Sequence, residues 1–334
     1  MKRTAVLLLC LAVFGCSQWY GSYEQEGMSI ITYNVQDLFD ARYDGGEYPE
    51  YDPREGLWDA PGYHLRLSRL RDVIARSGYP DVVLLQEIEK PEILDDLVSG
   101  YLYGRGYHYR AGTSTGTSAI ELGVITRFPI TQVLLHEGQF LDHVSPRPTM
   151  EVVLDTPWGH IHVFNAHWKS KIGGAEETEP ARRACAEALA SRIADIRMEH
   201  EDVYIIAGGD FNTTPFETGL YDLALLQWDE DVREGSLYIT ADGSMVDASK
   251  GVLYSPWLQE GGLNRPGTYV YRGEWEAIDH LLFCNNFFTG KSPDFQQAFV
   301  IEEGLLDEWG SPAGWNLNSR EGYSDHLPLG AVAR

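Results

Sequence analysis

Six short polar motifs, each close to a strand-like apolar run, constrain the fold of this 334-residue chain most strongly. They are Ile31-Thr32-Tyr33-Asn34, Leu84-Leu85-Gln86-Glu87, Asn165-Ala166-His167, Gly209-Asp210-Phe211-Asn212, Ile278-Asp279-His280 and Ser324-Asp325-His326. Carboxylates and Asn bind hard divalent cations such as Mg²⁺, and His beside Asp can transfer protons or bind phosphate. The motifs are too far apart for one loop, so the fold must bring them together. Together they indicate a metal-assisted phosphoester hydrolase.

Periodicity predicts more strands than helices, with the helices interspersed. Runs rich in Val, Ile and aromatic residues predict strands over 28–34, 81–87, 119–126, 149–154, 160–166, 203–208, 267–271, 278–284 and 326–333. Helices are predicted over 63–77, over 90–99 from Pro91, over 180–200 from Pro180, and over 215–226. In the first of these, Arg66, Arg69 and Arg71 fall largely outside the apolar face. This pattern favours an α/β protein with mixed sheets.

Three segments rich in Gly, Pro and acidic residues, 43–62, 171–179 and 228–266, are expected to be surface loops that face substrate.

The first sixteen residues predict export. Lys2 and Arg3 precede an apolar run, Thr4 to Phe14, that is too short to span a bilayer but suits a signal peptide. A small residue before Cys16 resembles a bacterial lipoprotein signal, in which Cys16 becomes lipidated and anchors the chain to a membrane. Ordinary secretion, with cleavage near Gly15 or Ser17, is the alternative. We expect 1–16 to be the signal peptide, 17–27 a tether and 28–334 a single domain.

Strong acidity argues against tight, non-specific binding of nucleic acid. The chain carries 26 basic and 50 acidic residues, a net charge of −24, and loss of Lys2 and Arg3 with the signal makes it −26. Such a surface repels polyanions at long range. A nuclease remains compatible, because bound Mg²⁺ and a local basic patch reverse the field at a cleft. The alternative is that the acidic surface has no binding role and only keeps an exported protein soluble.

Cys185 and Cys284 are the cysteines expected to remain in the mature domain as thiols or a disulfide. Export permits a disulfide, but the sequence leaves pairing open, and two distant cysteines are no zinc signature.

Two motifs contain the strongest local candidates for catalytic and phosphate-binding residues. In Gly208-Gly209-Asp210-Phe211-Asn212, the glycines are expected to allow a tight turn, and Asp210 and Asn212 would point the same way if the strand continued. Asn212 capping a following helix is the alternative. In His167-Trp168-Lys169-Ser170-Lys171, His167 could donate a proton, and both lysines could bind phosphate. A solvated loop with a structural His is the alternative here.

The two Asp-His dipeptides suggest a shared task. Neighbouring residues on a strand face opposite sides, so Asp279 is a poor partner for His280. Asp279 orienting His326 across strands is the better geometric prediction. Asn34 and Glu87 follow buried strands, as charged and polar residues often do, but such strand ends are also where α/β proteins place their sites.

Taken jointly, these motifs resemble the endonuclease/exonuclease/phosphatase superfamily, over essentially all of 28–334. Gly-Asp-Phe-Asn and Ser-Asp-His are its most specific marks, and His167 to Lys171 looks most like exported bacterial nuclease members. The resemblance implies a deoxyribonuclease-I-like, four-layer α/β sandwich of two mixed β-sheets flanked by helices. It also implies Mg²⁺ as cofactor, with Mn²⁺ or Ca²⁺ as substitutes, and nucleic acid as substrate. No protein partner is inferred.

The resemblance also implies residue roles. Asn34 and Glu87 match the principal Mg²⁺ site, with Asp325 near or on the metal. Asp210 and Asn212 match the pair that orients water and phosphate, and Asp279 matches the acid that orients His326. His167 matches a second catalytic His, with a looser match of Glu121 as its orienting acid. Arg147, in an Arg-Pro motif, and Lys169 are expected to contact the substrate phosphate. The Tyr of abasic-site nucleases has no assured counterpart.

The leading functional prediction is an exported nuclease. The same fold serves sphingomyelin phosphodiesterases and inositol-phosphate phosphatases, and a lipid-cleaving member would need an exposed apolar insertion. The short candidates for that insertion are Leu253 to Leu258 and Phe287-Phe288, and burial in the core is the alternative for each. A non-catalytic surface lipoprotein is the remaining alternative, and its expected mark would be a lost ligand position.

Overall fold

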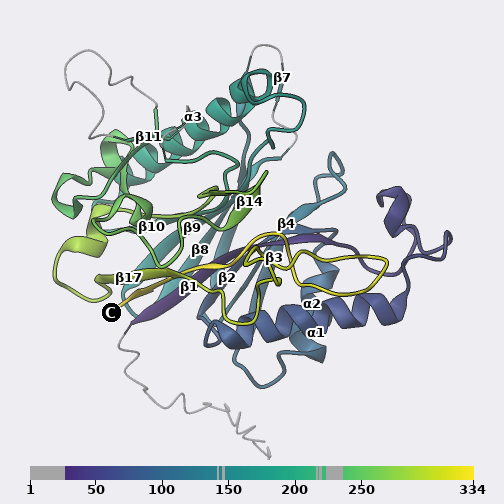
Figure 1. Ribbon diagram of the computed structural model, residues 1–334. Coiled ribbons are helices and arrows are strands. Elements are labelled where there is room, and N and C mark those ends of the chain that lie inside the picture. Colours follow the sequence, from purple (N-terminus) through teal and green to yellow (C-terminus); the bar gives the residue numbers. More distant parts are fainter. Residues whose placement is uncertain (1–26, 141–142, 145–146, 216, 218–219, 223–235) are drawn as a thin grey trace, which may run out of the picture.

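The computed structural model describes residues 27–140, 143–144, 147–215, 217, 220–222 and 236–334 (Figure 1). The expected signal peptide and all of the expected tether except Gly27 lie outside these ranges. Within the ranges, no helix is both long and apolar enough to cross a membrane.

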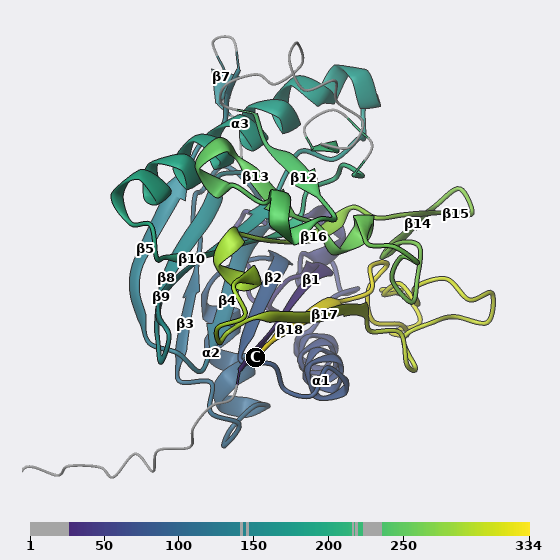
Figure 2. The same cartoon turned by 90° about the vertical axis from the view of Figure 1, so that its left-hand side faces the viewer.

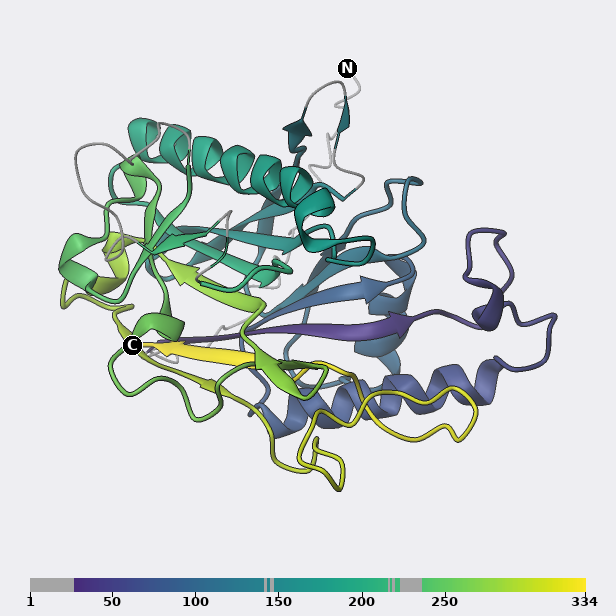
Figure 3. The same cartoon turned by 45° about the horizontal axis from the view of Figure 1, so that its top comes forward.

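Two mixed β-sheets pack face to face and are flanked by helices, as the resemblance implied (Figure 1). One sheet has the strand order β17-β18-β1-β2-β4-β3, and the other has β11-β12-β13-β16-β10-β9-β8-β5. Helices α1 (Ala60–Arg76) and α2 (Glu92–Gly100) lie outside the first sheet, and α3 (Ala175–Glu199) lies outside the second (Figure 3). The predicted α/β four-layer sandwich is therefore confirmed.

The strands of the six-stranded sheet are β1 (Met28–Leu38), β2 (Val82–Ile88), β3 (Tyr109–Gly112), β4 (Glu121–Thr126), β17 (Phe295–Val300) and β18 (Leu329–Ala333). Those of the eight-stranded sheet are β5 (Ile130–His136), β8 (Thr149–Thr156), β9 (Gly159–His167), β10 (Tyr204–Asp210), β11 (Tyr221–Asp222), β12 (Tyr238–Thr240), β13 (Val252–Tyr254) and β16 (Asp279–Phe283). Two small hairpins are formed by β6 (Gln139–Phe140) with β7 (His143–Val144) and by β14 (Tyr269–Tyr271) with β15 (Glu274–Glu276). Short 3₁₀ turns occupy Pro49–Tyr51, Gly243–Met245, Ala248–Lys250, Pro256–Leu258 and Asn285–Phe288.

All nine predicted strands are present. Eight lie in the two large sheets, which bury their apolar residues, and the ninth, predicted over 267–271, is β14 of the small hairpin with β15. In β10 every residue is buried, and β2 is buried except for Glu87. β1 runs parallel to β2, and β9 runs parallel to β10. Strands that run parallel end at the same edge of a sheet, so their polar end residues meet there.

Three predictions for helices need correction. The helix predicted from Pro180 begins at Ala175, directly after Gly173 and Gly174, and contains Pro180. The helix predicted over 215–226 is not seen among the described residues of that range, where Tyr221–Asp222 form β11. Arg66, expected outside the apolar face of its helix, is buried.

The predicted loops hold more structure than expected. α1 begins at Ala60 inside the segment 43–62, and α3 takes up 175–179. Segment 228–266 contributes β12 and β13, which join the eight-stranded sheet. Within the same segment Leu253 is fully buried, as is Phe287 further along the chain. These two sites proposed as exposed apolar insertions therefore belong to the core. Cys185 and Cys284 are buried and form no disulfide.

Candidate active site

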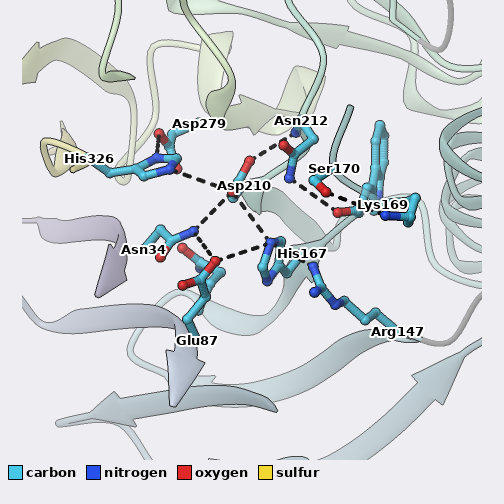
Figure 4. Close-up of polar contacts among 12 residues, drawn as sticks. Asn34, Glu87, Arg147, His167, Lys169, Ser170, Asp210, Asn212, Asp279 and His326 are labelled. Carbon is cyan, nitrogen blue, oxygen red and sulfur yellow. Dashed lines mark hydrogen bonds and ion pairs between the residues drawn. The ribbon is translucent and has the colours of Figure 1, made fainter. Parts of the chain in front are cut away.

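Residues of all six motifs meet between the two sheets (Figure 4). Asn34 lies in β1, Glu87 in β2, His167 at the end of β9 and Asp210 at the end of β10. Asp279 begins β16, which pairs with β10 so that Asp279 lies opposite Asp210. His326 follows the long C-terminal loop and reaches the same place.

Asp210 lies at the centre of this group. Its Oδ2 accepts a hydrogen bond of 3.0 Å from Asn34 Nδ2 and lies 3.6 Å from His167 Nε2 and 3.9 Å from His326 Nε2. Its Oδ1 accepts a hydrogen bond from the backbone of Asn212. Burial raises the pKa of Asp210 to about 7, although the neighbouring His326 acts to lower it. A carboxyl group with a pKa near neutrality is suited to accept a proton from water.

His326 and Asp279 form the cross-strand pair that the sequence predicted. Nδ1 of His326 donates to Oδ2 of Asp279 at 2.7 Å, and the Thr268 hydroxyl donates to the same oxygen. Burial acts to lower the pKa of His326, but the charges of Asp279, Asp210 and Asp325 outweigh it and raise that pKa well above its usual value. His326 is therefore held as an imidazolium. His280 lies elsewhere, with Nε2 bonded to the carbonyl of Thr213.

His167 has the opposite character. Burial lowers its pKa well below the usual value, and the charges of Arg147, His326 and Lys169 lower it further. Arg147 donates to His167 Nε2 at 2.8 Å, so His167 is neutral with Nε2 as the acceptor. Glu121 does not orient this ring in the described structure. Its carboxylate instead accepts hydrogen bonds from Thr113 and Thr115.

The two lysines of the His167 motif differ. Lys169 lies close to Arg147 and Arg182, and burial together with these two charges lowers its pKa. The single hydrogen bond described for its ammonium is a 3.4 Å contact with the Ser170 hydroxyl. Lys171, expected to bind phosphate, is instead ion-paired with Glu217 and Glu276, at 2.9 and 3.1 Å. Lys169 is thus the better placed of the two for an anion.

The segment around Asp210 and Asn212 departs from the prediction in two ways. β10 ends at Asp210, and Asn212 has a left-handed φ of +50°. Its side chain donates to the carbonyl of Trp168. The glycines form no turn but lie inside β10, where a Cβ at Gly209 would sit 2.0 Å from the Ala166 carbonyl oxygen. Glycine is needed here because β9 and β10 approach so closely.

A strained bulge shapes the acidic side of the site. β1 and β2 change register between Asn34 and Leu38, and Gln36, Asp37 and Glu87 all have left-handed φ, at +53°, +52° and +66°. Glu87 accepts hydrogen bonds from Asn34 Nδ2 at 3.0 Å and from the Asp37 backbone at 2.9 Å. Left-handed conformations of non-glycine residues concentrate at functional sites, where the surrounding structure compensates for their cost.

The donor set fits a cation in two places. Ligand atoms of Asp210, Asp279 and His326 lie within 4.8 Å of one another and could hold a metal ion, and Asp279 Oδ1 is buried without a hydrogen-bond partner. The acids Asp37, Glu87 and Asp325 lie near one another on the other side. Burial and the charges of Glu87 and Asp325 therefore raise the pKa of Asp37 to about 7. Nδ1 of His326 is bonded to Asp279 and the ring is protonated, so the carboxylate side suits a hard cation better.

The sequence did not identify several residues that lie at the site. Tyr269 packs on the His326 ring with centroids 4.7 Å apart, and Thr268 supports Asp279. Gln36 and Asp37 lie in the bulge described above. Their nearness to the Asn34 motif was visible in the sequence, but the bulge was not, because no glycine marks it.

Comparisons with known proteins agree with the fold. The model of the family described as Endonuclease/Exonuclease/phosphatase family matches residues 29–331. No curated protein matches the chain.

Solved structures share the fold at low sequence identity. A crystal structure of TDP2 from Caenorhabditis elegans has a TM-score of 0.58 and 14% identity, covering 92% of this chain and 74% of that one. Sphingomyelinase C from Streptomyces griseocarneus has a TM-score of 0.52 and 17% identity, with coverages of 92% and 99%. An endonuclease/exonuclease/phosphatase family protein from Leptotrichia buccalis has a TM-score of 0.53, 15% identity and the same coverages. At such identities the likeness concerns the fold alone.

Proposed function

Because this chain belongs to the endonuclease/exonuclease/phosphatase family, we propose that it is an exported, Mg²⁺-dependent phosphodiesterase that cleaves nucleic acid. Membership makes it a phosphoesterase of that family. The substrate, the metal and the export are our proposal.

The observation that carries the proposal is the meeting of Asp210 with two imidazoles of opposite character. His326 is held protonated beside Asp279, and His167 is held neutral beside Arg147. A buried carboxyl group between them has a pKa of about 7. Titratable groups whose environments move their pKa values apart are typical of paired acid and base roles.

These groups suit in-line attack of water on phosphorus. Asp210 accepts a proton from the water, and Asn212, two residues beyond it, positions water or phosphate. Protonated His326 donates to the oxygen on which negative charge develops, with Asp279 holding its ring. The sequence left open which histidine is the proton donor and offered His167 as a candidate, but the geometry favours His326, because His167 holds no proton on Nε2.

Asn34, Glu87 and Asp325 would hold Mg²⁺, with Asp37 beside them. When bound, the ion would stabilise negative charge on the phosphoryl group and the leaving oxygen. Asn34 at present offers Nδ2 to Glu87 and Asp210, while its Oδ1 accepts from the Gln36 backbone. Arg147 and Lys169 would contact the phosphate from the His167 side.

Nucleic acid is favoured over lipid by the buried state of two apolar candidates for membrane insertion, Leu253 and Phe287. The cations beside His167 form a local positive patch within an acidic chain, which suits a phosphate backbone. The binding-protein alternative is disfavoured, since every predicted ligand and catalytic position carries a competent side chain. We further propose lipidation of Cys16 as the membrane anchor.

The test uses residues 17–334 with Mg²⁺ or EDTA on plasmid DNA, RNA, sphingomyelin and inositol phosphates, with Asp210→Ala as control. Cleavage of DNA or RNA that requires both the metal and Asp210 supports the proposal. Cleavage confined to a lipid or a small phosphate ester would keep the chemistry and overturn the substrate. Inactivity on all four would overturn the enzymatic proposal for these substrates.

A further inference from the structure

Gln36 forms hydrogen bonds with Asn34 and with the C-terminal loop that carries Asp325 and His326. Its backbone N–H donates to Asn34 Oδ1 at 2.9 Å, which fixes the orientation of the Asn34 amide. Its side-chain Oε1 accepts hydrogen bonds from the backbone N–H of Asp325 at 3.0 Å and of Trp315 at 2.6 Å. Its Nε2 donates to the Trp315 carbonyl at 3.4 Å. One residue thus joins the end of β1 to the segment that carries His326.

That segment has little structure of its own. Between β17 and β18 the chain forms isolated bridges, Leu306 with Pro312 and Asn316 with Glu321, and no helix or strand. It follows α1 along the outside of the six-stranded sheet (yellow in Figure 3) and projects beside the β14–β15 hairpin (Figure 2). A long connection without regular structure depends on side chains to fix its position.

Two arginines of α1 fix the outer part of this loop. Buried Arg66 donates to the carbonyls of Val35, Gln36 and Tyr323. Arg69 donates to the carbonyls of Gly322 and Arg320 and lies over the rings of Trp315 and Tyr323. These contacts end at Tyr323, before the catalytic dipeptide.

At the catalytic end of the loop, His326 is held by Asp279 and by its bridge to Tyr269, and the Leu327 backbone N–H donates to the Thr268 carbonyl. Two further contacts hold Ser324 and Asp325. The Ser324 hydroxyl donates to the Asn34 carbonyl at 2.7 Å and accepts from the His326 backbone at 3.1 Å. Gln36 holds the Asp325 backbone. Among the described residues, Gln36 provides the side-chain hydrogen bond to the backbone N–H of Asp325.

We propose that Gln36 is a positioning residue for phosphoester hydrolysis, holding Asn34 and the Asp325-His326 dipeptide in the relative position that catalysis needs. This inference rests on the proposed hydrolytic function. Gln36 acts through the residues that it orients and does not contact the reacting atoms. Residues that orient ligands and catalytic groups in this way typically contribute about 10–100-fold to activity or metal affinity.

Three substitutions separate the possible causes. Gln36→Met keeps the length and removes both acceptor and donor. Gln36→Gly also removes the link but suits the left-handed φ of +53°, so it should fold even if Gln36→Met does not. Gln36→Glu keeps oxygens that accept from Asp325 and Trp315. Arg69→Met is the matched control, because it loosens the same loop further from His326.

With bis(p-nitrophenyl) phosphate and Mg²⁺, we expect Gln36→Met and Gln36→Gly to lower kcat about 10–100-fold with little change in KM. Gln36→Glu should recover most of the loss, and Arg69→Met should change kcat far less. Wild-type kcat in both Gln36→Met and Gln36→Gly would overturn the inference. So would an equal loss in Arg69→Met, or no recovery in Gln36→Glu.

Hydrogen exchange of peptides covering 313–326 tests the link without a substrate. Gln36→Gly should speed exchange at Asp325 and Trp315, and Gln36→Glu should not. Unchanged exchange in Gln36→Gly would overturn the link even if the wild type proved inactive. An inactive wild type with the expected exchange pattern would instead overturn the proposed function.

Discussion

Nδ1 of His326 lies 2.7 Å from Oδ2 of Asp279, a contact between residues 47 positions apart in the chain. Both side chains are buried, and Oδ2 of Asp210 lies 3.9 Å from the other ring nitrogen. This arrangement keeps the imidazole protonated and aims Nε2 toward the centre of the site. The account of catalysis given above depends on it.

Asp279→Asn should remove the charge that keeps His326 protonated. We expect kcat to fall about 10²–10⁴-fold, the range that acid–base groups contribute. Because the protonated form is the active one, the alkaline limb of any residual rate should move to lower pH. A pH–rate profile measures both effects, with Asp195→Asn on the exposed side of α3 as control. An unchanged alkaline limb would contradict the role of Asp279.

The wild-type pH–rate profile should have an acid limb set by Asp210. Burial raises the pKa of this group to about 7, so its proton-accepting form is lost as the pH falls through that value. The rate of bis(p-nitrophenyl) phosphate hydrolysis should therefore rise through neutrality and fall at higher pH, where His326 loses its proton. A rate that stays constant between about pH 5 and 8, where ordinary carboxylates are already ionised, would contradict this assignment.

Arg147→Met should weaken substrate binding more than the chemical step. Arg147 donates to His167 Nε2 and is proposed to contact phosphate. Loss of a hydrogen bond to a charged group costs about 1.5–3 kcal/mol, which corresponds to roughly a 10–100-fold rise in KM. Arg105→Met, which removes an exposed guanidinium elsewhere, is the control for net charge. Equal KM values for the two variants would argue against phosphate binding by Arg147.

Glu151→Gln should destabilise the fold without any contact with the site. Glu151 is fully buried and accepts from His136 and His162, both at 2.6 Å, and from Arg192. Breaking such a buried, charged group typically costs about 3–5 kcal/mol. Denaturant unfolding measures this loss. Glu179→Gln, which breaks a more exposed pair with Arg183 on α3, should cost no more than about 0.5 kcal/mol.

The same glutamate gives a pH test of stability. Burial alone acts to raise the pKa of Glu151, but His136, His162 and Arg192 lower it far below its usual value. Its contribution is therefore present above the pKa of the unfolded chain, about 4.3, and is lost as the pH falls further. The wild type should lose stability below about pH 5 more steeply than Glu151→Gln. Parallel acid unfolding curves would contradict this.

The sequence predicted the site because strand patterns and polar motifs coincide. Asn34, Glu87, Asp210 and His167 stand at the ends of predicted strands, which is where α/β proteins place their sites, and the resemblance to the family then grouped them. The Asp279–His326 pair followed from strand alternation, which excluded His280 as the partner of Asp279.

The features that the sequence did not predict depend on contacts between residues that are distant in the chain. Arg66 looks like a solvent-facing helix residue, yet it is buried and donates to carbonyls of β1 and of the C-terminal loop, contacts that periodicity does not reveal. Gln36 and Asp37 lie just beyond the strand predicted over 28–34, and nothing in the sequence marks their left-handed backbone. Segment 228–266 looks like a loop because of its Gly and Pro content, while β12 and β13 gain their stability from the sheet that they join.

Mg²⁺-dependent turnover of bis(p-nitrophenyl) phosphate by the wild type and by Asp210→Asn tests the central claim most directly. Asp210 is buried, so the isosteric amide should leave the fold intact, which thermal unfolding can verify. The account predicts turnover by the wild type that EDTA abolishes and that Asp210→Asn lowers by about 10²–10⁴-fold. Equal turnover by the two proteins, or turnover that persists in EDTA, would contradict it.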